Sequence, residues 1–252
     1  MNKTTLAQKM FNVKFSKKWQ FKRLGKLAED FLNGHLKCPY APLYNYYTLS
    51  DGPLLPYQVF GFLISVLKRT LPIGFKKNRV FMKQLRKKLW IFLKISRFEK
   101  MSVNELICGL KIKEILPIFD TKSKSKTTMP QSEHDKMKGY IRAFMRFLFD
   151  DFIVDLLRSN FYITEAAGSR SRLVYFRHDT WKSFTEPVLE NFQESMFQPI
   201  ISDNPKLISR ARCRLVPKDN GKFRPIMAFI KPPSTVKKQQ LDNRCHFLGG
   251  GK

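Results

Sequence analysis

The stretch LLRSNFYITEAAGSRSRLVYFRHDTW, residues 156–181, constrains the fold most strongly. It contains two short runs of β-branched and aromatic residues, 161–165 and 172–176, separated by AAGSRS. Gly168 lies in that separating segment and supplies the backbone freedom of a tight turn, so the pattern predicts a β-hairpin. Residues 137–159, just before it, carry apolar side chains over so wide a helical face that deep burial is expected. A buried helix leading into a hairpin is therefore the predicted centre of the fold.

Most of the remaining chain has the pattern of helices. Residues 59–68 and 76–97 are predicted helices, and the second places apolar residues at positions 81, 85, 89, 92 and 93, along one helical face. Residues 121–136, TKSKSKTTMPQSEHDK, are rich in Ser, Thr and Lys, so they are predicted to form a linker or mobile loop. No internal repeat is apparent in the sequence. The predicted fold class is mainly α.

The chain is strongly basic. Its 252 residues include 47 Lys and Arg against 20 Asp and Glu, which gives a formal net charge of +27. Residues 1–100 hold 21 basic and 4 acidic side chains, residues 101–200 hold 14 and 13, and residues 201–252 hold 12 and 3. A nearly neutral, apolar middle between basic ends favours a packed scaffold that presents a surface to a polyanion. The longest apolar stretch, 59–67, has about half the length of a bilayer span, so membrane insertion is not expected.

One face of the helix predicted over residues 76–97 is a basic stripe. Its cations recur every three or four residues, and no Glu stands at i,i+4 to neutralise them. A stripe of this kind suits contacts with successive phosphates, although a plain solvated helix face would have the same pattern. Phosphate binding is the favoured interpretation. The stripe contains Arg79, Lys83, Arg86, Lys87 and Lys94, and the candidate RNA-binding residues are its first four members together with Lys76.

Residues 14–23, KFSKKWQFKR, alternate cations with aromatic rings. Unpaired bases stack on exposed rings while neighbouring cations hold phosphates, so this mixture suits a single strand or an RNA loop. An amphipathic helix whose rings pack on the protein would have the same composition, and both interpretations stay open. The candidate RNA-binding residues are Lys14, Lys17, Lys18, Trp19, Lys22 and Arg23.

The predicted hairpin also combines rings with cations. Strand periodicity places Tyr162 and Thr164 on one side, and Phe161, Ile163 and Glu165 on the other. The sequence does not decide which side faces solvent. Each ring of the hairpin is therefore a candidate for core packing as well as for stacking on a base.

No constellation of catalytic residues is visible in the sequence. The four His have no metal-ligand spacing, and the four Cys stand far apart, as expected of reduced intracellular thiols. Polymerase chemistry needs aspartates that hold a pair of metal ions. The nearest candidates, Asp150, Asp151 and Asp155, lie in the apolar helix and are better interpreted as surface or capping charges. No catalytic residue and no metal site is predicted.

The order of these segments resembles the RNA-binding domain of the telomerase reverse transcriptase family, followed by the start of the fingers. FLNGHLKCPYAPL, residues 31–43, looks like the CP motif of that family, and residues 59–119, with KNRVFMKQLRKKL and SRFEKMSVNELICGLKI, look like its QFP region. Residues 156–181 are similar to the T motif, the most specific of these signals. RLVPKDNGKFRPI, residues 214–226, resembles motif 1 of reverse transcriptases, a strand pair that turns at positions 220–221.

The resemblance implies a mainly helical fold with two unequal helical lobes joined by helices, a small β-hairpin and a short β segment from motif 1. It predicts one RNA-binding domain over residues 1–229, in which the fingers begin at 213–229. Residues 230–252, which end in GGGK, do not match the motif expected next and form a tail of uncertain origin.

The resemblance also implies contacts with RNA. The CP match places Lys37 and Tyr40 near RNA, and Lys218 and Arg224 of motif 1 correspond to a fingers element close to template and incoming nucleotide. The T match, with the composition of the hairpin, nominates Phe161, Tyr162, Arg170, Arg172, Tyr175, Arg177 and Trp181.

For function, the resemblance implies anchoring of a telomerase catalytic protein on a stem-junction element of telomerase RNA, with a part in setting the template boundary. This chain is expected to bind RNA without polymerising DNA and without a cofactor, because the palm aspartates lie downstream in the family. The full-length enzyme would be a nuclear RNA-directed DNA polymerase that uses magnesium and telomeric DNA, and its other domains are expected partners.

Two alternatives stay open at the level of the sequence. One is an RNA-binding N-terminal region of a different retroelement reverse transcriptase. The other is an interaction protein that applies its basic face to acidic protein or lipid.

Overall fold

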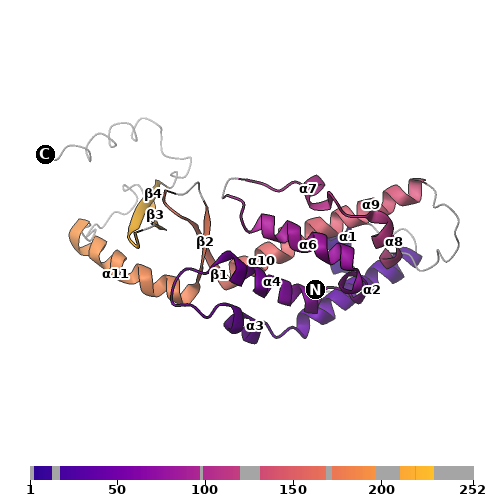
Figure 1. The fold of residues 1–252 in the computed structure, drawn as a ribbon, viewed down its shortest axis with the longest axis horizontal. Helices are drawn as coiled ribbons and strands as arrows, with labels where there is room; N and C mark the ends of the chain where they lie inside the picture. Colours follow the sequence, from indigo (N-terminus) through magenta and orange to yellow (C-terminus); the bar gives the residue numbers. More distant parts are fainter. Residues whose placement is uncertain are drawn as a thin grey trace, which may run out of the picture. The chain divides into compact units, whose positions relative to one another are not determined.

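A computed structural model of the chain describes residues 3–12, 18–96, 99–119, 131–168, 172–196, 211–218 and 220–229. These residues form a mainly helical structure with two small antiparallel sheets, as predicted (Figure 1). The elements are α1 (Lys3–Phe11), α2 (Lys18–Leu36), α3 (Tyr40–Tyr47), α4 (Pro56–Thr70), α5 (Ile73–Lys77), α6 (Arg79–Phe92), α7 (Val103–Ile107), α8 (Ile112–Phe119), α9 (Gln131–Arg146), the π-helix η1 (Phe147–Ile153), α10 (Val154–Asn160), β1 (Phe161–Glu165), β2 (Leu173–Arg177), α11 (His178–Met196), β3 (Ala211–Pro217) and β4 (Phe223–Phe229).

The chain divides into two compact units of unequal size. The larger unit comprises Met1–Glu165 and Ser169–Ser183, and the smaller one comprises Ala166–Gly168 and Phe184–Lys252. The larger unit therefore contains the helices up to α10, the β1–β2 hairpin and the first turns of α11. No described helix is long and apolar enough to cross a membrane.

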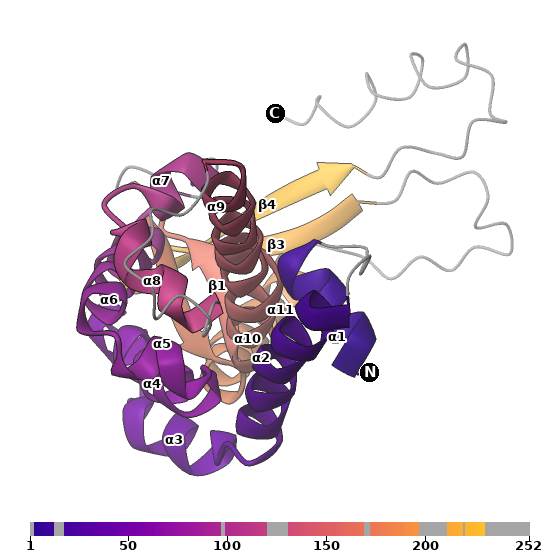
Figure 2. The same cartoon turned by 90° about the vertical axis from the view of Figure 1, so that its right-hand side faces the viewer.

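The core of the larger unit is built around α9 and η1, and Figure 2 views its helices along the bundle. Phe144 of α9 stacks on Phe75 of α5, with the ring centroids 4.5 Å apart and an interplanar angle of 16°. Phe147 of η1 meets Phe31 of α2 at 5.6 Å. Phe rings supply large apolar surfaces and pack favourably at such offsets, which explains why a chain with 23 Phe can hold its many short helices together.

The helix predicted over residues 76–97 is interrupted near its start. Asn78 separates α5 from α6, and its side-chain oxygen accepts a hydrogen bond from the backbone N–H of Phe81 at 2.9 Å. Asn is a favoured N-cap because it satisfies a backbone donor that the first helical turn leaves unpaired. The apolar face is otherwise as predicted, since Phe81, Leu85 and Leu89 are fully buried.

The predicted linker and the helix after it need correction. The predicted linker spans residues 121–136, but α9 begins at Gln131, so the last six of these residues are helical. The buried helix expected over 137–159 is continuous with α9 and ends at Asn160, with η1 in its middle.

The hairpin forms as predicted. Strands β1 and β2 are antiparallel, with Phe161 opposite Arg177 and Glu165 opposite Leu173. Gly168 has φ 111°, a conformation that strongly favours glycine. The backbone N–H of Leu54 donates to the carbonyl of Tyr175 at 2.7 Å, so the segment before α4 pairs with the free edge of β2.

The smaller unit contains the second predicted strand pair. Strands β3 and β4 are antiparallel, and Gly221, with φ 74°, lies in the turn expected at positions 220–221. The N–H of Lys218 donates to the carbonyl of Lys222 at 2.8 Å and closes that turn. The tail over 230–252 lies outside the described residues.

Candidate nucleic-acid interface

The basic stripe of α6 lines a depression on the larger unit. The depression has a volume of about 670 Å³ and is lined by Lys68 of α4, Lys76 of α5, and Arg79, Met82, Lys83, Arg86 and Lys87 of α6. The five predicted candidates therefore lie around one hollow. The sequence did not identify Lys68, because only the fold brings the end of α4 beside α6, or Met82, an apolar residue of α6 that is not part of the basic stripe. The basic pair Lys68–Arg69, where the helix predicted over 59–68 ends, is the one signal that could have suggested Lys68.

The charge of this depression is not neutralised within the described part of the chain. All of its lining residues except Met82 are cationic, and none of the six cations forms an ion pair with a described acidic residue. Lys76 is partly fixed, because its Nζ donates to the carbonyl of Arg69 at 3.3 Å. A concave surface lined by one sign of charge concentrates the electrostatic field and attracts counter-charge.

Two rings of the hairpin belong to the core. Phe161 and Tyr175 are each 2% exposed, and the hydroxyl of Tyr175 donates to the carbonyl of Leu93 at 3.2 Å. Burial raises the pKa of the Tyr175 hydroxyl. Neither ring has a free face on which a base could stack, which corrects the prediction that these two side chains contact RNA. Thr164, which lies on the same side of β1 as Tyr162, is also buried.

Tyr162 and Trp181 come together on the other side of the hairpin. Their rings are stacked, with centroids 4.0 Å apart and an interplanar angle of 14°, and Trp181 also meets Phe176 at 5.0 Å. Both rings are half-buried. The two predicted residues therefore form one aromatic unit that joins β1 to the first turn of α11.

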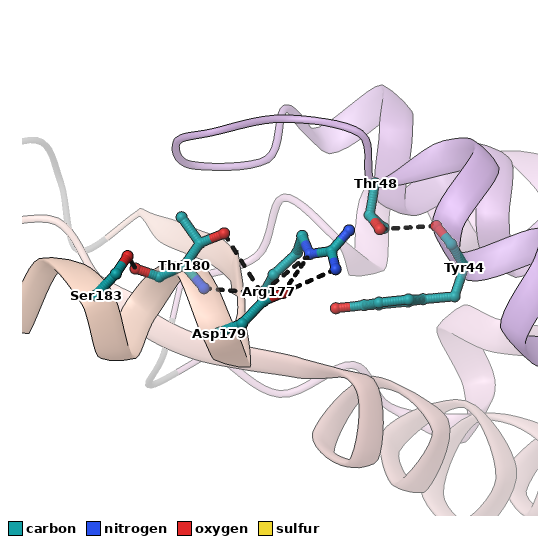
Figure 3. A network of polar contacts seen from close by, with 6 residues as sticks. All are labelled: Tyr44, Thr48, Arg177, Asp179, Thr180 and Ser183. Atoms are coloured by element: carbon teal, nitrogen blue, oxygen red, sulfur yellow. Dashed lines mark hydrogen bonds and ion pairs between the residues drawn. The ribbon is translucent and has the colours of Figure 1, made fainter.

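Arg177 at the end of β2 is held by a polar network (Figure 3). Its Nε donates to Asp179 Oδ1 at 3.0 Å and its Nη2 donates to Asp179 Oδ2 at 2.8 Å, while the guanidinium lies 5.3 Å from the centroid of the Tyr44 ring. These bonds lower the pKa of the Asp179 carboxyl to about 2. The geometry gives Arg177 a structural role between β2, α3 and α11, and contact with RNA stays a prediction.

The CP-like segment places Lys37 and Tyr40 close in sequence but in different settings. Lys37 is exposed, whereas Tyr40 is half-buried and its hydroxyl forms a hydrogen bond with Nδ1 of His35. Burial, followed by the nearby thiol of Cys38, raises the pKa of the Tyr40 hydroxyl, and burial likewise raises the pKa of Cys38. Lys37 is therefore the more accessible of the two predicted contacts.

The basic N-terminal segment is only partly described. Lys14 and Lys17 lie outside the described residues, and of Lys18, Trp19 and Lys22 the structure gives only the helical backbone at the start of α2. Arg23 is defined, and its Nη2 donates to the carbonyl of Pro117 at 3.1 Å, which ties α2 to α8.

The remaining candidates lie on the hairpin and on the smaller unit. Arg172 is exposed just before β2, and Arg170 lies outside the described residues. Lys218 and Arg224 are exposed on the β3–β4 pair.

The helical aspartates have ordinary surface roles. Asp150 pairs with Arg146 at 3.4 Å, and Asp151 pairs with Lys9 at 3.3 Å. Within the described ranges, no group of three or more His, Cys, Asp or Glu is placed to hold a metal ion.

Comparison with models of protein families identifies the family of this chain. The model of the RNA-binding domain of the telomerase ribonucleoprotein complex matches residues 58–192, more than half of the chain. The chain belongs to this family. The match covers α4 to α11 and thus includes both the basic depression and the hairpin of this telomerase RNA-binding domain.

Related telomerase proteins align with most of the chain. Telomerase reverse transcriptase of Oryza sativa subsp. japonica is 24% identical over 263 residues, which cover 94% of this chain and 21% of the relative. Telomerase reverse transcriptase of Rattus norvegicus is 28% identical over 184 residues, which cover 68% of this chain and 16% of the relative. The chain thus spans about a fifth or less of the length of these curated relatives.

Solved telomerase structures have the same fold. A telomerase from Candida tropicalis in complex with a TWJ fragment of telomeric RNA matches with a TM-score of 0.77 at 16% identity, over 98% of this chain and 38% of that one. A vertebrate RNA-binding domain of telomerase matches with a TM-score of 0.61 at 19% identity, over 79% of this chain and 86% of that one. The mainly helical architecture is therefore that of telomerase RNA-binding domains.

Proposed function

We propose that this domain anchors a telomerase reverse transcriptase on its telomerase RNA by gripping a stem-junction element. Family membership carries this proposal, and the basic depression supports it, because cations that face no described acid are suited to phosphate oxygens. The rice and rat relatives are telomerase reverse transcriptases, and the Candida tropicalis neighbour was solved with an RNA fragment, which also supports the proposal. The family match favours telomerase over a different retroelement enzyme.

In this proposal the domain also helps to set the template boundary, and the parent protein is a nuclear, magnesium-dependent RNA-directed DNA polymerase that extends telomeric DNA. This chain itself binds RNA and does not polymerise DNA. In the family, the catalytic aspartates of the palm come after the region that this chain resembles. Incubation of the purified chain with primer, template, magnesium and nucleotides should give no extension product, and a template-dependent product would contradict this division of labour.

A filter-binding experiment tests the anchoring function. The chain is titrated against a telomerase RNA stem-junction and against a scrambled duplex of equal length, at physiological salt. We expect tighter binding to the stem-junction, because RNA-binding domains recognise shape, unstacked bases and 2′-hydroxyls in addition to charge. Equal affinity for both RNAs would indicate attraction by charge alone, and binding to neither would reject the proposal.

A salt titration tests the part assigned to the depression. Each lost phosphate contact should reduce the slope of log affinity against log salt by about 0.7 to 0.9. The variant Arg79→Ala/Lys83→Ala should therefore bind the stem-junction more weakly and with a flatter slope. An unchanged slope would assign these two cations to plain solvent exposure.

A further inference from the structure

The six cations of the depression are supplied by three separate elements. Arg79, Lys83, Arg86 and Lys87 follow one face of α6 at spacings of four, three and one residues, while Lys68 comes from the last turn of α4 and Lys76 from α5. Residues three or four apart on a helix are neighbours on its surface. A ligand in the depression would therefore meet positive charge from α6 and from the α4–α5 side at once.

The size of the depression limits what can occupy it. The four cations of α6 lie within nine residues, so the first and the last are about 12 Å apart along the helix. In double-stranded DNA each strand carries a phosphate about every 3.4 Å of helix axis. Three or four consecutive phosphates thus match the length of the stripe. A hollow of about 670 Å³ is comparable to a small-molecule site, which suits a short segment of backbone.

The chemistry of the lining favours phosphate over other anions. Arg79 and Arg86 can each donate two parallel hydrogen bonds to a phosphate group, and the four lysines act as point charges around it. Met82, which is 8% exposed, provides an apolar surface among them.

We propose that this depression is a compact polyphosphate site, and that its occupant in the cell is a short, single-stranded, turned segment of the RNA backbone with about three or four phosphates. The identification of RNA as the occupant depends on the function proposed above. The existence of the site does not depend on that function, because a free polyphosphate of the same charge and length should also bind there.

The first experiment uses inorganic tripolyphosphate as the probe, without RNA. Thermal unfolding of the full chain is followed as tripolyphosphate is titrated at constant ionic strength. We expect a saturable rise in the unfolding midpoint. In the variant Lys83→Ala/Lys87→Ala the apparent dissociation constant should rise at least about tenfold, because the loss of a single hydrogen bond to a charged group weakens binding by about that factor.

The matched control is Lys77→Ala/Lys113→Ala. It removes the same two charges from exposed lysines on α5 and α8 that do not line the depression. Its apparent dissociation constant should stay within about twofold of the wild-type value, because neither lysine lines the depression and salt screens exposed charges. An equal loss in both variants, or a rise in midpoint that never saturates, would show diffuse attraction by the net charge and would overturn the site.

The second experiment identifies the occupant by competition. Tripolyphosphate should displace the stem-junction RNA from wild-type protein at concentrations near its own dissociation constant. Saturable tripolyphosphate binding without displacement of RNA would overturn the RNA backbone as occupant and leave a free polyphosphate. Failure of the chain to bind stem-junction RNA would reject the proposed function instead, and the tripolyphosphate result would still decide whether the site exists.

Discussion

Gly34 sets how closely α2 approaches the end of α4. A Cβ at this position would lie 2.7 Å from the carbonyl oxygen of Arg69 and 2.9 Å from Cα of Thr70, and both are backbone atoms that cannot move aside cheaply. Gly34→Ala should therefore destabilise the chain by about 1 to 3 kcal/mol, as overpacking does elsewhere. Urea unfolding measures the change.

Gly25 in the same helix is the control for that substitution. A Cβ there meets nothing within 4 Å, so Gly25→Ala should leave stability unchanged or raise it by up to about 1 kcal/mol through helix propensity. Equal losses in the two variants would show that close approach to α4 is not what requires glycine at position 34.

Asp179 should make stability depend on acid pH. The hydrogen bonds from Arg177 lower its folded-state pKa to about 2 from an ordinary 3.8, so the carboxylate stabilises the fold above its unfolded pKa, and this contribution is lost as pH falls from about 5 through 2. Asp179→Asn should be less stable than wild type at neutral pH, and the difference should shrink steadily as pH falls from about 5 toward 2.

Thermal unfolding between neutral pH and pH 2 checks this expectation. Asp155→Asn, which changes an exposed carboxylate on α10 with no ion pair among the described residues, is the matched control and should run parallel to wild type. A gap between Asp179→Asn and wild type that is constant across this range would assign the effect of Asp179 to packing instead of charge.

At the scale of single residues, the sequence predicted a hairpin rich in aromatic rings but not which way each ring faces. Phe161 and Tyr162 are neighbours in β1, yet one is 2% exposed and the other half-buried. The two-residue period of a strand requires that they point to opposite sides. It does not say which side meets the core, because that depends on α3 and α4, which are distant in sequence and pack on Phe161.

At the scale of elements, the stacked pair Tyr162 and Trp181 should hold the hairpin to α11. Aromatic pairs contribute about 0.5 to 1.5 kcal/mol beyond the area they bury. A double-mutant cycle with Tyr162→Leu and Trp181→Leu, measured by urea unfolding without RNA, should give a coupling energy in that range. A coupling near zero, with weakened RNA binding in both single variants, would instead favour rings that serve mainly to stack on bases.

Element types were predictable, and element boundaries were less so. The hairpin and the β3–β4 turn follow from local signals, since Gly168 and Gly221 take the positive φ that their turns demand. The break at Asn78 is also a local capping event, but it competes with an apolar pattern that runs straight through it. The start of α9 at Gln131 could not be recognised in a polar sequence, because the apolar contacts that stabilise this helix begin only at Met137.

At the scale of the whole molecule, the net charge of +27 should make the free chain more stable in salt. Like charges repel more strongly in the compact state, and added ions screen them. The thermal midpoint should rise as NaCl increases from about 0.05 M to about 0.5 M, while RNA affinity falls over the same range. A midpoint that falls with salt would mean that attractive ion pairs dominate the charge balance.

The variant Lys83→Ala/Lys87→Ala refines that test. Because these lysines lie in a hollow with four further cations, their removal should raise the midpoint at low salt more than Lys77→Ala/Lys113→Ala does. Such a result would mean that repulsion among the clustered cations destabilises the domain when no ligand is bound. Equal effects of the two variants would show that the depression carries no local excess of repulsion.

The gathering of charge into one hollow is what the sequence could not supply. The stripe of α6 is visible as a helical repeat and Lys76 was predicted with it, but Lys68 joins them only through the turns between α4, α5 and α6. A local sequence pattern specifies which residues share one face of a helix, whereas a concave surface depends on how several helices pack together.

The π-helix η1 has a consequence for how this protein can vary in length. A π-helical segment accommodates a surplus residue inside an otherwise α-helical rod while the segments on either side keep their alignment. Loss of one residue between Phe147 and Ile153 would let the rod relax to ordinary α geometry, with Gln131 at one end and Asn160 at the other still facing as before. Deletion of a single codon, which shifts the register of most buried helices, should therefore be tolerated within η1.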